Sequence, residues 1–192
     1  MAVEKQERTN LVATVRILYI CTANQCRSPF AEATLQREAG GRPLEVSSAG
    51  LMSGSREVRP HGIAVGRERG LDLSAHRSRQ VTEVDIDRFD LILTMERRHS
   101  REIVAEHPEL AARVFTVKQF DRWATDHRRP RRAALRPWLE LHGSRRPVQE
   151  LLGDSEKDTV ADPYNSAAPA WRQMADLFDA HAVRLIAWLE GC

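Results

Sequence analysis

The sequence predicts an α/β fold in which a central four-stranded parallel sheet lies between two layers of helices. Apolar runs typical of buried strands alternate with helical stretches, and the links between them are short. This alternation favours right-handed strand–helix–strand units, which give a parallel sheet covered on both faces. The strands are expected at residues 15–20, 44–48, 89–95 and 114–117. A chain of 192 residues is most simply one domain.

The expected helices have recognisable ends. Pro29 suits a first helical position and Gly40 a helix end, and Pro60 and Gly70 bound a second helix in the same way. Shorter helices are expected at residues 81–88 and 97–106. The last helix carries one apolar stripe with three-four spacing, which predicts packing against the sheet. Its members are Trp171, Met174, Ala175, Phe178, Ala182, Leu185, Ile186 and Leu189.

Composition excludes several classes of protein. The 29 basic and 27 acidic residues nearly balance, so no overall field favours nucleic acid. Residues 1–14 are expected to form a flexible N-terminal tail ahead of a single domain at 15–192, and no apolar stretch is long enough for a membrane span. The chain has three cysteines, too few to suggest a fold held together by disulfide bonds. This cysteine content indicates a reducing, cytoplasmic location. No cluster has metal-ligand spacing, so neither a metal nor a cofactor is expected.

The stretch Cys21-Thr22-Ala23-Asn24-Gln25-Cys26-Arg27-Ser28-Pro29 joins the first strand to the first helix. Backbone N–H groups of such a loop converge with the positive end of the helix dipole on an oxyanion site. The same field favours a thiolate, the nucleophilic form, at Cys21. Arg27 can offer two N–H groups to a phosphate, and Ser28 can serve as N-cap or donate to the Cys21 sulfur. The alternative is a buried, inert cysteine at a strand end.

A second signal is Asp162-Pro163-Tyr164, shortly before the last helix. Hydrolysis of a phosphate ester needs a proton on the leaving oxygen, and a carboxylic acid on a loop can supply it. The proline keeps Asp162 extended rather than helical. An ordinary Asp-Pro turn is the alternative interpretation.

Three candidate residues end strands or follow them directly. Cys21, Ser48 and Glu96 all fall at carboxyl ends of expected strands. In open parallel sheets ligands bind beyond those ends. The spacing therefore predicts that these residues line one cleft.

Together these residues resemble the low-molecular-weight protein tyrosine phosphatase family. The family's loop has Cys, five residues, Arg, then Ser or Thr and usually Pro, and its acid belongs to an Asp-Pro-Tyr motif. Residues 48–50, 74–80 and 90–96 also look like family segments, and the resemblance spans residues 15–189 with one insertion. It implies that Cys21 is the nucleophile, Arg27 the phosphate clamp and Asp162 the general acid and then base, with a phosphate-binding loop after the first strand.

The resemblance also implies supporting roles. Asn24 would hold the loop through Ser48 and His76, and Ser28 would stabilise the departing thiolate. Glu96 would face Arg27 across the mouth of the site, and Tyr164 would form an aromatic wall. The remaining loop members, Thr22, Ala23, Gln25 and Cys26, would surround the phosphate, and Cys26 matches a cysteine that in some members forms a reversible disulfide with the nucleophile.

Some positions depart from the family pattern. Ala23 stands where glycine is usual, and Gln25 where an apolar residue or, in the arginine-phosphatase branch, threonine is common. The segment after Ser48 lacks the aromatic residue that many tyrosine-specific members carry. These departures leave the mechanism in place and bear on the choice between phosphotyrosine and other substrates.

The expected activity is that of a phosphomonoesterase working through a cysteinyl-phosphate, with phosphotyrosine on a protein as substrate by resemblance. A phosphoarginine phosphatase is one alternative. Arsenate reduction on the same fold is another, although it needs relay cysteines and only Cys26 and Cys192 are available. A phosphoprotein-binding module without catalysis is the alternative outside enzymes.

Residues 121–160 are expected to form an Arg-rich helical insertion, with short helices ending at Gly143 and Gly153. It could present a basic surface to an acidic or phosphorylated partner. The favoured interpretation is a helical insertion with a solvated charged face. The arginines concerned are Arg122, Arg128, Arg129, Arg131, Arg132, Arg136, Arg145 and Arg146.

Overall fold

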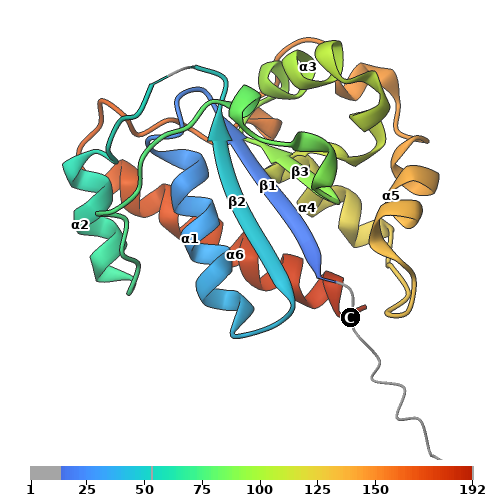
Figure 1. Ribbon diagram of the computed structural model, residues 1–192, viewed down its shortest axis with the longest axis horizontal. Coiled ribbons are helices and arrows are strands. Elements are labelled where there is room, and N and C mark those ends of the chain that lie inside the picture. The colour runs from blue at the N-terminus through green and yellow to red at the C-terminus, as the bar shows by residue number, and fades with distance from the viewer. Residues whose placement is uncertain (1–13, 53, 192) are drawn as a thin grey trace, which may run out of the picture.

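Four parallel strands in the order β2-β1-β3-β4 form the centre of the computed structural model, which describes residues 14–52 and 54–191 (Figure 1). The predicted three-layer α/β class is confirmed. Apart from Thr14, the predicted tail at residues 1–14 lies outside the described residues. The strands are β1 (Val15–Cys21), β2 (Leu44–Gly50), β3 (Leu91–Thr94) and β4 (Val114–Thr116).

The strand register brings the candidate residues to one edge of the sheet. β1 pairs with β2 and β3, so that Cys21 lies opposite Gly50 and Ile20 opposite Thr94. β3 also pairs in parallel with β4, so all four carboxyl ends point the same way, and the tip of β2 lies towards the top of Figure 1. The segments that follow β1, β2 and β3 meet there, which is where a parallel sheet binds its ligands.

Alternate side chains of β1 enter two separate cores. Ile17 and Tyr19 join the larger core, and Leu18 and Ile20 join the smaller one, as the two-residue period of a strand requires. The larger core is covered by α1 (Arg27–Ala39), α2 (Pro60–Glu68), α4 (Val117–Asp126), α5 (Leu135–Gly143) and α6 (Ala168–Leu189). The smaller core is covered by η1 (Val81–Glu83), η2 (Ile86–Arg88), α3 (Arg97–Glu106) and η3 (Pro108–Arg113).

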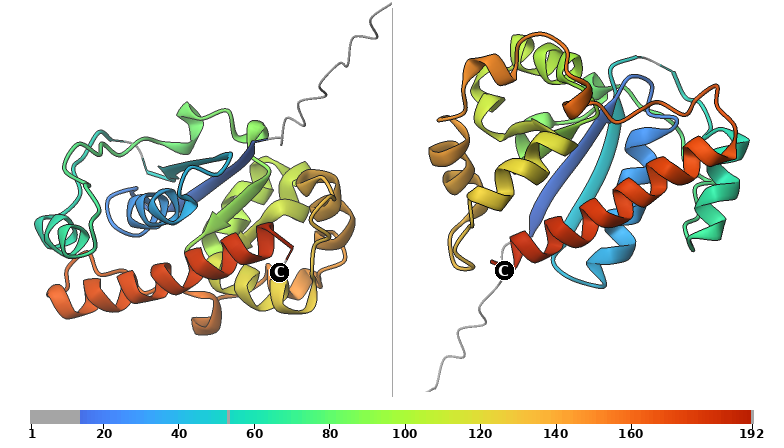
Figure 2. Two further views of the ribbon diagram at one scale, coloured as in Figure 1. Left: turned by 90° about the horizontal axis from the view of Figure 1, so that it is seen from below. Right: turned by 180° about the vertical axis from the view of Figure 1, so that it is seen from behind.

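The helix α6 carries the predicted apolar stripe. It runs diagonally across β1 and β2 in the rear view (Figure 2). Every predicted stripe residue is buried except Leu189, which is only partly buried. A Cβ at Gly62 would lie 2.5 Å from the Trp171 ring, so α2 can pack directly on α6 because residue 62 has no side chain.

Two of the expected helices differ from those in the structure. The helix α1 begins at Arg27 rather than Pro29, and its N-cap is Cys26, so Ser28 does not cap it. The reason is that the loop closes early: the Phe30 N–H already donates to the Cys26 carbonyl, at 3.3 Å. The expected helix at 81–88 consists of two separate 3-10 turns, because Val84 is extended.

The Arg-rich segment differs from its expected description. Its expected start at residue 121 lies inside α4, a helix whose Phe120 is buried in the larger core. α5 ends at Gly143 as predicted, whereas only the 3-10 turn η4 (Val148–Glu150) precedes Gly153.

Two of its arginines are not on a solvated face. The side chain of Arg129 is buried and donates to the carbonyls of Ala133 and Leu189. The Arg146 guanidinium lies 3.6 Å from the centroid of the Phe115 ring, and burial lowers its pKa to about 10. These side chains fasten the segment to the domain.

Within residues 14–52 and 54–191, no helix combines the length and the apolar character needed to cross a membrane.

Candidate active site

The loop after β1 is held against the end of β2. The N–H groups of Leu51 and Met52 donate to the carbonyls of Cys21 and Thr22, at 3.1 and 2.8 Å. A Cβ at Gly50 would lie 2.8 Å from the backbone nitrogen of Asn24. The loop can therefore rest directly on β2 only because residue 50 is glycine.

Asn24 sits at the turn of the loop with a left-handed φ of 51°. Asparagine tolerates this conformation better than most residues. The turn directs the Asn24 N–H at the Cys21 Sγ, 3.2 Å away. One backbone donor of the loop therefore points at the candidate nucleophile, as an oxyanion or thiolate site requires.

The Asn24 side chain is part of a buried polar network beneath the loop. Its Nδ2 donates to Ser48 Oγ at 2.7 Å and to Ser28 Oγ at 2.9 Å. Ser48 in turn donates to the Glu32 carboxylate at 2.5 Å. Glu32, on α1, was not predicted as a site residue, although its place one turn after the loop is a signal that could have found it.

His76 and Arg79 hold Asn24 from the other side. His76 Nε2 donates to the Asn24 carbonyl at 2.9 Å, and the Arg79 N–H donates to Asn24 Oδ1 at 3.1 Å. Because a carbonyl can only accept, Nε2 of His76 carries a hydrogen. Burial lowers the pKa of His76, which favours the neutral ring. The structure thus brings His76 to the loop, through the Asn24 backbone.

Cys21 lies at the bottom of the loop with only 2% of its surface exposed. Its Sγ is 3.1 Å from Ser28 Oγ, which also lies 3.2 Å from the Ala49 carbonyl. A serine hydroxyl has one hydrogen, so it can donate to only one of these at a time. The geometry allows it to donate to Ala49 when Cys21 is a thiol and to the sulfur when Cys21 is a thiolate.

Arg27 connects the loop to two carboxylates. Its Nη1 donates to Glu96 at 2.8 Å, and its Nη2 lies 2.7 Å from an Asp162 oxygen and 3.1 Å from Thr22 Oγ1. Its Nε is buried and has no hydrogen-bond partner among the described residues. A buried guanidinium N–H costs free energy unless a partner binds it. This donor is therefore available for an oxyanion in the loop.

Glu96 stays ionised beside the guanidinium groups. Burial opposes its charge, but hydrogen bonds from Arg98 and Arg27 outweigh burial and lower the pKa of Glu96 to about 2. Glu96 therefore faces Arg27 as a carboxylate at neutral pH.

Arg98 and His99 are site residues that the sequence reasoning missed. Thr22 Oγ1 lies 2.8 Å from Arg98 Nη2 and 3.0 Å from His99 Nε2. Burial, together with the charges of Arg27 and Arg98, lowers the pKa of His99 to about 3 against the opposing charge of Glu96. Both residues lie in the first turn of α3, which follows β3 after two residues, so a search of the helix start beyond this strand end could also have found them.

Asp162 reaches the loop from the far end of the chain. Its side chain is 41% exposed, and its Oδ1 accepts from the Tyr164 N–H at 3.1 Å. Just before it, Val160 is tied to β3 because its N–H donates to the Met95 carbonyl at 2.8 Å. The candidate acid therefore lies over Arg27 with one side open to solvent.

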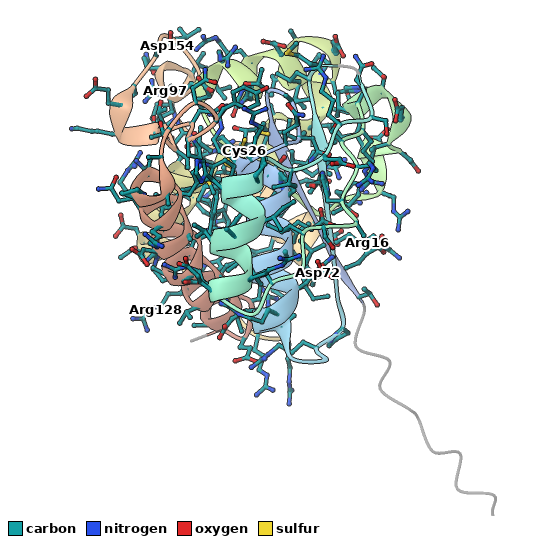
Figure 3. All side chains as sticks on the ribbon, turned by 90° about the vertical axis from the view of Figure 1, so that its left-hand side faces the viewer. Arg16, Cys26, Asp72, Arg97, Arg128 and Asp154 are labelled. Carbon is teal, nitrogen blue, oxygen red and sulfur yellow. The ribbon has the colours of Figure 1, made fainter. Side chains whose placement is uncertain are left out.

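The segment that leads to Asp162 is anchored by the buried carboxylate of Asp158. This carboxylate accepts from Arg97 Nε at 2.5 Å, from Gln119 Nε2 at 3.1 Å and from Arg122. Figure 3 shows Arg97, Asp154 and Cys26 towards the same end of the molecule, with Arg128 towards the other. Part of the Arg-rich segment thus supports the loop that carries the candidate acid.

Two loop side chains face inward. Cys26 is 4% exposed, and burial, with the charges of Asp162 and Cys21, raises the pKa of its thiol. Cys26 therefore remains a thiol. Gln25 is also buried, and its Nε2 donates to the Glu57 carbonyl at 3.3 Å.

The described residues contain no group of three or more His, Cys, Asp or Glu side chains placed to hold a metal ion. What the site does combine is a sulfur under an N–H donor, a guanidinium with a free donor, and an accessible carboxyl group. This set can attack a phosphorus atom, hold its oxygens and protonate a leaving group.

Comparison with known proteins defines the family. The model of the low molecular weight phosphotyrosine protein phosphatases matches residues 16–130, so the chain belongs to that family. The chain is 36% identical over 110 residues to the probable low molecular weight protein-tyrosine-phosphatase EpsP of Ralstonia solanacearum, covering 57% of this chain and 75% of EpsP. It is 40% identical over 107 residues to the protein-arginine-phosphatase of Geobacillus stearothermophilus. This alignment covers 55% of this chain and 70% of that phosphatase.

The structural comparison extends further along the chain. The YwlE arginine phosphatase from Geobacillus stearothermophilus superposes with a TM-score of 0.69 and 29% identity, over 92% of this chain and 93% of YwlE. The resemblance and the assignment to the phosphatases are therefore confirmed. The family match ends at residue 130, however, so the place of Asp162 beside Arg27 is seen in the structure and not in that match.

Proposed function

We propose that the chain hydrolyses phosphomonoesters on proteins through a cysteinyl-phosphate on Cys21. The thiolate attacks phosphorus, so that an S–P bond forms while the P–O bond to the leaving group breaks. In the substrate complex the phosphate oxygens replace the Asp162 carboxylate at Arg27 Nη2. Asp162, protonated in that complex, gives its proton to the leaving oxygen, and Arg27 with the loop N–H groups holds the other phosphate oxygens.

The second step releases phosphate. A water oxygen attacks phosphorus while the S–P bond breaks, and Asp162 takes up the water proton. Ser28 donates a hydrogen bond to the departing sulfur, which leaves as a thiolate. The observation that carries the proposal is the contact of one guanidinium, Arg27, with the candidate acid at 2.7 Å at the rim of the loop that contains Cys21.

We propose phosphotyrosine as the substrate residue. The Tyr164 ring is 36% exposed next to the acid and can stack on an aryl phosphate. Phosphoarginine is the second candidate, because a relative with 40% identity is named protein-arginine-phosphatase. The free thiols of Cys21 and Cys26 support a reducing, cytoplasmic compartment.

The test is hydrolysis of para-nitrophenyl phosphate, followed by phosphotyrosine and phosphoarginine peptides of equal sequence. We expect turnover by the wild-type protein, none by Cys21→Ser, and a fall of about 10²-fold or more for Arg27→Lys, because an ammonium cannot replace the planar fork. Arg172→Lys, on α6, changes an exposed ion pair with Glu68 of α2 and is the matched control that keeps the wild-type rate.

Equal rates of wild type and Cys21→Ser would overturn the proposal. So would a wild-type protein that folds but hydrolyses none of the three substrates. Faster turnover of the phosphoarginine peptide would overturn only the choice of substrate residue.

A further inference from the structure

Arg59 makes a contact across the mouth of the site that the mechanism does not use. It is exposed and immediately precedes α2, and its guanidinium carbon lies 4.7 Å from the centroid of the Tyr164 ring. Tyr164 is two residues after Asp162 and donates its N–H to that carboxylate. The contact therefore joins the start of α2 to the loop of the candidate acid.

Arg59 is also the cation at this rim that no carboxylate neutralises. Arg27 is paired with Glu96 and Asp162, and Arg98 is paired with Glu96. Among residues 14–52 and 54–191, the Arg59 guanidinium has no ion-pair partner, and it lies over the aromatic ring of Tyr164. Its charge nevertheless reaches the loop, because it acts to lower the pKa of Cys26 against the larger effect of burial.

A guanidinium in this position can select substrates. Stacking on an aromatic ring leaves its N–H donors free for a carboxylate, and Arg is well suited to use both modes at once. The same charge repels a cation, such as a basic side chain beside the phosphorylated residue or the guanidinium group of phosphoarginine.

We propose that Arg59 is a specificity-determining residue that binds an acidic side chain adjacent to the phosphorylated residue of the substrate. The substrate class is thus a phosphopeptide with aspartate or glutamate next to the phosphorylated position. This inference rests on the proposed phosphatase activity. Arg59 touches the substrate beside the reacting phosphate and takes no part in the chemistry.

The expected gain in kcat/KM from an acidic neighbour is modest because Arg59 is exposed to solvent. Exposed ion pairs change binding modestly, so an acidic neighbour raises kcat/KM about 3- to 10-fold over a neutral one. The preference shrinks when the salt concentration is raised from about 0.05 M to about 0.5 M, because salt screens exposed charges.

The experiment compares three phosphotyrosine peptides that differ only beside the phosphorylated residue, which is flanked by glutamate, glutamine or lysine. kcat/KM is measured for the wild type, Arg59→Gln and Arg56→Gln. Arg56 is also an exposed arginine, three residues earlier, and serves as the matched control. We expect the order glutamate, glutamine, lysine in wild type and in Arg56→Gln, and nearly equal values for all three peptides in Arg59→Gln.

Two results overturn the inference: a wild type without charge preference, and an Arg59→Gln variant that keeps the wild-type preference. Para-nitrophenyl phosphate separates these failures from that of the proposed function. A wild type that hydrolyses it but shows no peptide preference contradicts only the role of Arg59. A wild type that hydrolyses neither contradicts the phosphatase proposal itself.

Discussion

Substitution of Gly50 by alanine should displace the phosphate-binding loop without touching a reactive group. The added Cβ would lie 2.8 Å from Asn24 N, 2.9 Å from the Ala23 carbonyl carbon and 3.1 Å from the Thr22 oxygen. All three are backbone atoms, so no side chain can rotate away. To restore ordinary contact distances of about 3.5 Å or more, the loop must move by roughly 0.5–1 Å.

A displacement of that size is large for catalysis. A misplacement of about 1 Å costs on the order of 10²-fold in rate, or about 2.7 kcal/mol of transition-state stabilisation. The strain of overpacking adds a loss of about 1–3 kcal/mol in the free energy of unfolding. We therefore expect Gly50→Ala to remain folded, with kcat/KM for para-nitrophenyl phosphate reduced about 100-fold.

Kinetics and thermal unfolding of Gly50→Ala should be measured beside a matched control. Gly66→Ala, in α2, adds a Cβ whose one tight contact is the end of the Leu73 side chain, at 3.1 Å, while the Leu71 carbonyl oxygen lies at an ordinary 3.5 Å. This variant should keep the wild-type kcat/KM. A folded Gly50→Ala protein with wild-type kinetics would refute the reasoning, because the loop could then not rest on β2 as described.

Three further predictions concern single groups. Asp162→Asn should lower kcat about 10²-fold or more. The loss should be larger for phenyl phosphate than for para-nitrophenyl phosphate, because the nitrophenolate leaving group needs less protonation. Equal losses for the two substrates would contradict the assignment of Asp162 as the proton donor. Folded His99 stays neutral down to a pKa of about 3, whereas the unfolded ring takes up a proton below 6.5, so the free energy of unfolding should fall by up to about 5 kcal/mol between these pH values. Urea unfolding at several pH values should show that the free energy of unfolding falls less steeply with decreasing pH in His99→Asn than in the wild type. An equally steep fall in both proteins would count against a buried neutral ring. Peroxide should inactivate the wild type reversibly through a bond between Cys21 and Cys26; a Cys26→Ala variant that recovers equally well on addition of thiol would contradict this.

The strands and the loop could be predicted because local patterns determine them. β1 is a short apolar run, and a polar loop with a cysteine and an arginine follows it. Parallel strands share one edge for their carboxyl ends, so Cys21, Ser48 and Glu96 could be placed in one cleft from spacing alone.

The remaining features depend on contacts between distant parts of the chain. Ser28 satisfies the local rule for an N-cap, yet its hydroxyl faces Cys21 and Ala49 because the loop has already begun the helix. The ion pair of Arg27 with Asp162 requires the whole fold to bring two ends of the chain together. No periodicity in the sequence encodes such a pair.

The polar side chains that lie inside the protein could not be predicted from the sequence for the same reason. His181 lies on the apolar face of α6, where its ring bonds the Tyr19 hydroxyl at 2.9 Å and the Asp121 carboxylate at 2.6 Å. Arg129 and Arg146 were expected on a solvated surface because charge runs usually are. Both guanidinium groups instead donate to carbonyl groups of distant residues, Arg129 to Leu189 and Arg146 to Ala111 and Val114, which only the tertiary structure brings near.

The most direct test of the central claim is to trap the covalent intermediate. The wild-type protein is mixed with para-nitrophenyl phosphate, denatured within milliseconds and analysed by peptide mass spectrometry. We predict that the peptide containing Cys21 gains the mass of one phosphoryl group, about 80 Da, on that sulfur. Release of para-nitrophenol with the phosphoryl group on another residue, or with no phosphoenzyme, would contradict the account.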